Sequence, residues 1–162
     1  SRFYFDELPG EKYLRYIPNS DHSLRGTDAL ESLGAFYEAV LADRPLPRFD
    51  WTFETDGSIR VRARDQPSAV RLWSAHNPRH RDFRLESVGP IYRSQDLAPQ
   101  ADGAYVARVA PAEGFTAYFV ELEFASGGKA PFKFTTAVRV APDVYPNGEP
   151  EAGKTRVGPK RQ

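Results

Sequence analysis

Between residues 51 and 142 the sequence repeats one pattern, a short segment of alternating apolar and polar residues followed by a turn. Alternation with a period of two is typical of a β-strand that buries one face, and the turns are marked by glycine, proline and aspartate. No helical period interrupts this region. The pattern therefore predicts an all-β unit whose strands occupy residues 51–55, 59–65, 69–76, 90–97, 104–110, 114–124 and 132–142.

The longest of these segments, residues 114–124, indicates how the strands would pack. Its apolar face is formed by Thr116, Tyr118, Val120, Leu122 and Phe124. A tight Asp56-Gly57 turn joins the first two strands. About seven short strands separated by such turns are typical of an immunoglobulin-like or fibronectin-like β-sandwich. In such domains a tyrosine ties a loop to a strand, and we expect Tyr118 to have this structural role.

The first 45 residues have a different character. Residues 1–9 have helix-compatible spacing, residues 11–18 alternate like a strand, and residues 26–45 carry the helical period between a Thr27 cap and Pro45. One strand and two helices are elements of an α/β fold, but a single strand cannot form a sheet alone. We predict an α/β segment at 1–45, a β-sandwich at 46–142 and a flexible tail at 143–162, so the chain is α+β by content.

The predicted helix has a broad apolar face at a period of 3.6 residues. Because a single strand cannot cover such a face, we expect the first 44 residues to expose apolar surface that a complete sheet would bury. The residues of this face are Leu30, Leu33, Tyr37, Val40 and Leu41.

Composition excludes several classes of function. The formal net charge is zero, which argues against a nucleic-acid or anionic-membrane binder, because such proteins carry a basic excess. No apolar run approaches the roughly 20 residues of a membrane span, and no signal peptide is recognisable. The absence of cysteine excludes thiolate catalysis and cysteine-bound zinc, and we expect no cofactor. Because methionine is also absent, we expect a piece of a longer protein.

His22 is the candidate catalytic residue. It lies on a loop between the predicted strand at residues 11–18 and the helix at residues 26–45. Imidazole is a good general base near pH 7, and in serine hydrolases of the α/β class the histidine comes last in the chain order. The alternative is an exposed turn histidine. No G-x-S-x-G motif occurs, so a nucleophile and its acid would have to lie before Ser1, and we expect Asp21 to be a turn former.

Other polar residues have simpler interpretations. His76 and His80 have the spacing of a metal-binding pair only if they lie on a helix. Pro78 lies between them and disfavours a helix, so we expect no metal site. Residues 60–84 contain seven arginines and two aspartates. This positive face could attract an acidic partner, or it could be a solvated strand surface.

The sequence also resembles a known family. The stretches SRFYFDELPGEKYLRYIPNSDHSL and DALESLGAFYEAVLADRPLPRFDW resemble the C-terminal part of the PhoPQ-activated pathogenicity-related protein family, and AVRLWSAHNPRHRDFRLESVGPIY and GFTAYFVELEF resemble its trailing region. The resemblance covers nearly all of residues 1–142. It implies the end of an α/β-hydrolase-like domain followed by a β-sandwich, in a secreted or periplasmic protein, with His22 at the position of the hydrolase histidine.

Two hypotheses about function remain. In the first, the chain is the C-terminal portion of an α/β-hydrolase-like protein, and His22 is the general base for ester or amide hydrolysis in the intact form. The upstream remainder of that protein is then its partner, and the chain alone is inactive because it lacks the nucleophile. In the second, the β-sandwich is a non-catalytic module that binds protein or glycan through the positive face of residues 60–84.

Overall fold

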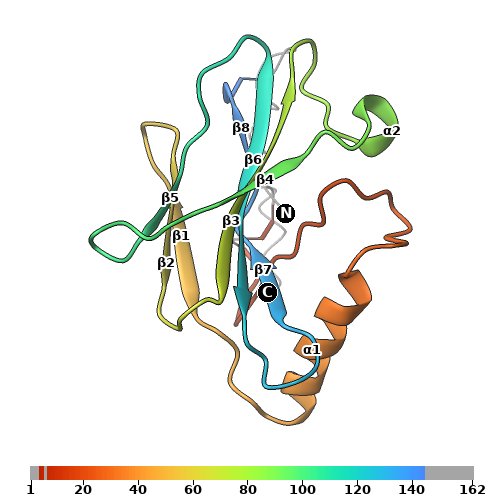
Figure 1. Cartoon of the computed structure of the whole chain (residues 1–162), viewed down its shortest axis with the longest axis vertical. Coiled ribbons are helices and arrows are strands. Elements are labelled where there is room, and N and C mark those ends of the chain that lie inside the picture. The colour runs from red at the N-terminus through yellow and green to blue at the C-terminus, as the bar shows by residue number, and fades with distance from the viewer. Residues whose placement is uncertain (1–3, 6, 145–162) are drawn as a thin grey trace, which may run out of the picture.

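The computed structural model describes residues 4, 5 and 7–144. In this part of the chain, two antiparallel sheets form the body and two helices accompany them (Figure 1). The α+β content expected from the sequence is therefore confirmed. The predicted tail at residues 143–162 lies outside the described residues from position 145 onward.

The smaller sheet has the strand order β1-β2-β5. Its strands are β1 (Phe49–Phe53), β2 (Ile59–Ala63) and β5 (Tyr105–Ala107). β1 and β2 form a hairpin in which Phe53 pairs with Ile59. The predicted turn lies in its loop, where Gly57 has a φ of 88°, a conformation that glycine adopts without steric cost.

The larger sheet has the order β4-β3-β6-β7, and β8 also pairs with β6. Its strands are β3 (Ala69–Asn77), β4 (Arg93–Asp96), β6 (Phe115–Phe124), β7 (Phe132–Thr135) and β8 (Arg139–Ala141). β6 is the central strand. Its predicted apolar face, from Thr116 to Phe124, is buried in one core cluster with side chains of the smaller sheet, including Ile59 and Val61. The inner faces of the two sheets thus share a core.

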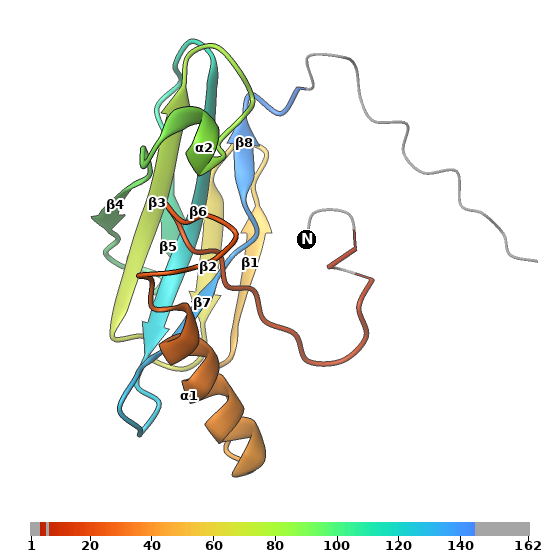
Figure 2. The same ribbon diagram turned by 90° about the vertical axis from the view of Figure 1, so that its right-hand side faces the viewer.

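Helix α1 (Ala29–Leu41) confirms the predicted helix, with bounds a few residues shorter. The Thr27 hydroxyl accepts a hydrogen bond from the Ala29 N–H at 3.3 Å, close to the predicted cap position. The side of α1 that packs on the body carries the small side chains of Ala35 and Ala39, which are buried. The helix projects from one end of the two sheets (Figure 2).

Three expectations about single elements are wrong. A short helix, α2 (Leu85–Val88), interrupts the region that was expected to be all β. The predicted strand at 132–142 is divided into β7 and β8, because the Val120 N–H donates to the Thr136 hydroxyl at the break. Residues 11–18 form only an isolated bridge, Leu14 with Thr135, because this segment crosses the edge of β7 and does not run along it.

The expected helix at residues 1–9 is also absent from the described residues of that stretch. Residues 4, 5, 7 and 8 form turns, in which the Glu7 N–H donates to the Tyr4 carbonyl and the Leu8 N–H to the Phe5 carbonyl. Phe3 lies outside the described residues. One or two such turns are too short to be stable as a helix without packing.

An aromatic cluster joins the N-terminal segment, α1 and both sheets. The ring of Phe134 in β7 lies with its centroid 4.4 Å from that of Tyr13, 6.1 Å from that of Phe49 in β1 and 6.2 Å from that of Phe36 in α1. Such pairs contribute about 0.5–1.5 kcal/mol beyond burial of their area. The four rings come from four different segments, so their contacts fix the relative positions of these segments.

A charged network holds the N-terminal segment on the opposite face of the larger sheet. Arg15 forms ion pairs with Glu121 of β6 at 2.5 Å and with Asp28 at 2.7 Å, and Lys133 of β7 contacts Asp28 at 2.7 Å. Glu121 is only 4% exposed. A buried carboxylate requires such pairing, because an isolated charge away from water is costly.

The Tyr118 hydroxyl donates to the Gly57 carbonyl at 2.5 Å and so ties β6 to the β1–β2 loop. Tyr118→Phe should lower the free energy of unfolding by about 1–2 kcal/mol, because the half-buried Gly57 carbonyl loses its donor. Denaturant unfolding followed by circular dichroism measures this. Tyr37→Phe, at a side chain that is 60% exposed, is the control, and equal effects of the two substitutions would contradict the prediction.

Asp28 makes stability depend on pH. Burial alone would raise the pKa of its carboxyl, but the hydrogen bond from Lys133 and the charge of Arg15 outweigh burial and lower the pKa below 3.8. A carboxyl with a lowered pKa stabilises the folded state above its unfolded pKa, and this contribution disappears as the pH falls through the folded pKa. Asp28→Asn should therefore be destabilising at pH 7, and its difference from the wild type should shrink below about pH 3.8.

Urea unfolding of both proteins at pH 7, 5 and 3 measures this difference. Asp50→Asn, at an exposed carboxyl, is the control for the loss of one negative charge. A difference between Asp28→Asn and the wild type that stays constant across this pH range would contradict the prediction.

Candidate functional site

The candidate site is the His22 loop, residues 18–26, which precedes α1 and lies between α1 and α2 (Figure 1). The loop consists of turns, and Asn19 and Leu24 each have a φ of 55°. His22 is exposed, so its imidazole is accessible to a group supplied from outside the described residues. The structure thus places His22 on a surface loop just before a helix.

Asp21 organises the turn around His22. One oxygen of its carboxylate accepts hydrogen bonds from the backbone N–H of Ser23 at 2.8 Å and from the Ser23 hydroxyl at 2.6 Å. The Ser23 hydroxyl is the main reason that the pKa of Asp21 is lowered. The carboxylate is therefore engaged within its own turn, which is the turn-forming role expected from the sequence.

Asn19 connects the loop to the sheets. Its side-chain amide donates to the Tyr92 carbonyl at 3.0 Å, and its side-chain oxygen accepts from the Tyr92 N–H at 2.9 Å. Tyr92 lies just before β4, and its ring and that of Tyr16 each contact Phe119 of β6, with centroids 5.9 and 5.8 Å away. Burial raises the pKa of Tyr92 to about 12, so its hydroxyl stays protonated near neutral pH.

The chemistry available in this loop is proton transfer by one imidazole. A general base must lie within hydrogen-bond reach of the proton that it removes. Among residues 4, 5 and 7–144, no three His, Asp or Glu side chains gather closely enough to hold a metal ion. His76, the first histidine of the predicted metal-like spacing, instead contacts the Thr116 hydroxyl at 3.1 Å.

The positive face of residues 60–84 is paired with acidic side chains from other strands and loops. The closest N–O distances are 3.0 Å for Arg60–Asp102, 3.3 Å for Arg71–Glu123 and 3.3 Å for Arg81–Asp143. Three of the arginines that sequence composition counted as an excess therefore have local counter-charges. Exposed pairs of this kind contribute little to stability, and they reduce the attraction of the face for an acidic partner.

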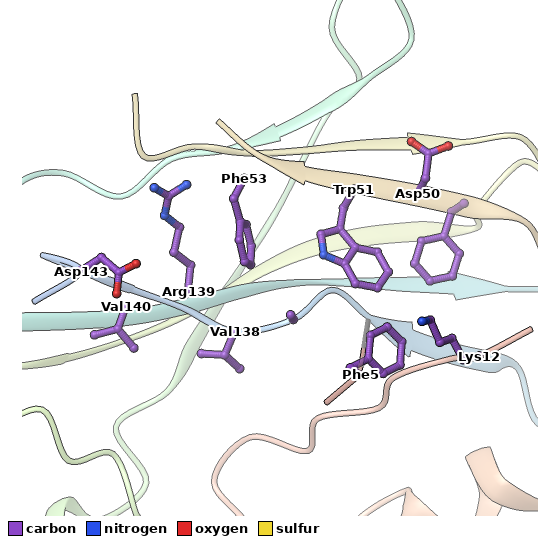
Figure 3. Close-up of a pocket in the computed structure, with 11 residues that line it drawn as sticks. Phe5, Lys12, Asp50, Trp51, Phe53, Val138, Arg139, Val140 and Asp143 are labelled. Atoms are coloured by element: carbon purple, nitrogen blue, oxygen red, sulfur yellow. The ribbon is translucent and has the colours of Figure 1, made fainter. Parts of the chain in front are cut away.

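A groove of about 630 Å³ lies elsewhere, between the edge strand β1 and residues 137–140 (Figure 3). Aromatic side chains of β1 line it, and the ring of Phe5 stacks on Trp51 with centroids 6.0 Å apart. The guanidinium of Arg139 lies over the Phe53 ring at 5.4 Å. The groove shares no lining residue with the His22 loop.

Sequence reasoning missed the residues that anchor the His22 loop. Asn19 lies two residues before the expected turn former Asp21, and its partner Tyr92 is 73 positions away. Arg15 lies in the segment 11–18, and its partner Glu121 is 106 positions away. No local pattern announces a pairing at such separation. Alternation places Glu121 on the outer face of segment 114–124, so no local signal in the sequence indicates its buried partner.

In the described part of the chain, no helix combines the length and the apolar composition that crossing a bilayer requires.

Comparison with known proteins finds a protein family that matches the region of the His22 loop. A profile of the PhoPQ-activated pathogenicity-related protein family matches residues 1–84, which include the His22 loop and α1.

The chain is also 28% identical over 175 residues to autocrine proliferation repressor protein A of Dictyostelium discoideum, in an alignment that covers 91% of this chain and 35% of the relative. The chain thus spans about a third of the length of this curated relative. No solved structure matches it. Because the family profile covers more than half of the residues, the chain belongs to the PhoPQ-activated pathogenicity-related protein family.

Proposed function

We propose that this chain is the C-terminal part of an α/β-hydrolase-like protein in whose intact form His22 is the general base for ester or amide hydrolysis. Residues 1–45 are then the end of the hydrolase-like domain, and residues 46–142 are an immunoglobulin-like or fibronectin-like β-sandwich. The chain alone is inactive, because it contains no serine elbow of the G-x-S-x-G type. A secreted or periplasmic location belongs to the same proposal and is supported by the family resemblance.

The exposed apolar face of α1 is the observation that carries this proposal. Leu30 is 83% exposed and Leu41 is 69% exposed, whereas Ala39 on the opposite side is fully buried. The leucines of the helix therefore point away from the body, whereas Phe36 packs against it. The other exposed members of this face are Leu33, Tyr37 and Val40.

A helix with such an exposed apolar face is stabilised when another domain or sheet covers that face. Burying one leucine or valine side chain contributes about 1.5–3 kcal/mol, and contiguous apolar patches on soluble proteins mark surfaces that another element covers. Helices of α/β domains have this property, because they cover the faces of a parallel sheet. The position of His22 on a loop immediately before such a helix is in keeping with the histidine loop of an α/β-hydrolase, although residues 11–18 form an isolated bridge and not the expected strand.

The strand order supports the β-sandwich part of the proposal. The first, second and fifth strands form one sheet, and the third, fourth, sixth, seventh and eighth form the other. Immunoglobulin-type domains divide consecutive antiparallel strands between two facing sheets in this manner. The bond from Tyr118 to Gly57, which ties a strand of one sheet to a loop of the other, is a further feature in keeping with this architecture.

In the intact protein His22 would take the proton of an upstream serine hydroxyl as that oxygen attacks the carbonyl carbon, and would return it to the leaving group. An upstream aspartate would hold the other ring nitrogen. Asp21 does not serve this purpose, because Ser23 occupies its carboxylate. Both partners of His22 therefore come from outside this chain.

A binding role for the sheets is the second candidate. The ion pairs on the face of residues 60–84 weaken the case for that surface, but the groove beside β1 has the aromatic lining of a ligand site. Protein and glycan remain the two classes of ligand for this candidate.

His22→Ala in the intact protein should lower the rate of p-nitrophenyl ester hydrolysis by at least about 100-fold, because general base catalysis contributes about 10²–10⁴. His80→Ala, at another exposed loop histidine, should leave the rate unchanged. Circular dichroism should give the same spectrum for all three proteins. Retained hydrolysis in His22→Ala would contradict the proposal and favour the binding role.

Leu33→Asp tests the face of α1. In this chain it should change the free energy of unfolding by less than about 0.5 kcal/mol, because Leu33 is exposed, and it should reduce self-association in sedimentation experiments. In the intact protein it should cost about 2 kcal/mol or more, as for a buried leucine. Ala39→Asp should destabilise both proteins. A small effect of Leu33→Asp in the intact protein would contradict the proposal.

A further inference from the structure

We propose that Asn19 is a positioning residue for His22, and that it acts by fastening the His22 loop to the trailing sheets through the backbone of Tyr92. The inference rests on the proposed function, because it concerns the base of that reaction. It assigns to the two-sheet body a part in catalysis, namely to fix where the imidazole stands.

Two hydrogen bonds join the side chain of Asn19 to the backbone of Tyr92. The amide of Asn19 uses its donor and its acceptor on the two backbone groups of one residue, at 3.0 and 2.9 Å. An asparagine amide pairs in this way because it has the same donor and acceptor groups as a peptide unit. The φ of 55° at Asn19 suits asparagine, which enters the left-handed region more readily than most residues.

The other hydrogen bonds of the loop do not reach the sheets. In the described part of the chain, the bonds of Ser20, Ser23 and Thr27 close turns within the loop and its junctions with the neighbouring residues. Beneath the loop lies a cavity of about 170 Å³ between residues 16–20 and the segment that contains α2 and Tyr92. In the described part of the chain, the two bonds of Asn19 are therefore the side-chain hydrogen bonds that connect residues 18–26 to the segment before β4. The ion pairs of Arg15 and Asp28 hold the two ends of the loop, outside these residues.

The turn of Asp21 transmits this anchoring to His22. Because Ser23 is bonded to the carboxylate of Asp21 at 2.8 and 2.6 Å, residues 21–23 form a stiff unit that contains His22. This unit begins two residues after Asn19. Loss of the Asn19 bonds lets the unit pivot relative to the sheets, and a displacement of about 1 Å at a catalytic group can reduce the rate by about 100-fold.

The experiment compares Asn19→Gly with Asn77→Gly in the intact protein, with p-nitrophenyl acetate as substrate. Glycine accepts the positive φ of residue 19, so Asn19→Gly removes the two bonds without backbone strain. Asn77 is the matched control, because its side chain makes the same kind of bond to the backbone, to the Asp82 carbonyl at 2.8 Å and from the Arg79 N–H at 3.0 Å, but at the end of β3.

Asn19→Gly should lower kcat by about 10- to 100-fold and leave KM unchanged, whereas Asn77→Gly should lower stability and leave kcat unchanged. In this chain, ¹⁵N relaxation should record greater motion at His22 in Asn19→Gly and no change in Asn77→Gly. An unchanged kcat in Asn19→Gly, with activity lost in His22→Ala, would overturn the inference alone. Equal loss of kcat in both asparagine variants would also overturn it. Retained activity in His22→Ala would overturn the proposed function and this inference together.

Discussion

The contacts of the Phe134 ring are the constraint on which the rest of the structure depends. Tyr13, Phe36 and Phe49 bring the N-terminal segment, α1 and the smaller sheet to this one side chain of β7. A short segment such as residues 11–18 cannot hold a position through its own backbone bonds, because it forms one bridge only. The aromatic cluster holds this segment on one face of the larger sheet, and the Arg15–Glu121 ion pair holds it on the other face.

This arrangement explains why the central strand is buried on both faces. Sequence alternation assigns Val120 and Leu122 to a core and Phe119 and Glu121 to solvent, as in an antiparallel sheet with one wet face. The N-terminal segment covers that second face with Tyr16 over Phe119 and with Arg15 on Glu121. The predicted boundary at residues 45–46 stays a prediction, and many contacts cross it. Under the proposed function, the His22 loop keeps a fixed position relative to the sheets.

The amphipathic character of α1 points to what this unit is attached to. Packing on β7 uses the side of the helix that carries Ala35, Phe36 and Ala39, and the leucine side is exposed. A helix stabilised from one side in this way is well placed to join two bodies. The His22 loop lies at its N-terminal end, so the same helix that would dock on an upstream sheet would also bring the imidazole to it.

The sequence by itself determined the local features. The period of two placed the strands, the Asp56-Gly57 pair placed the first hairpin, and the helical period placed α1 and its apolar face, because each of these depends on neighbours within a few residues. It also selected His22 and the turn around Asp21. Only the tertiary structure decided what those elements meet. The division of the last strand at Thr136, the anchoring of Asn19 on Tyr92 and the burial of Glu121 by Arg15 depend on partners from 16 to 106 positions away. Local periodicity carries no information about such partners, since these contacts form only when distant segments of the chain come together in the tertiary fold.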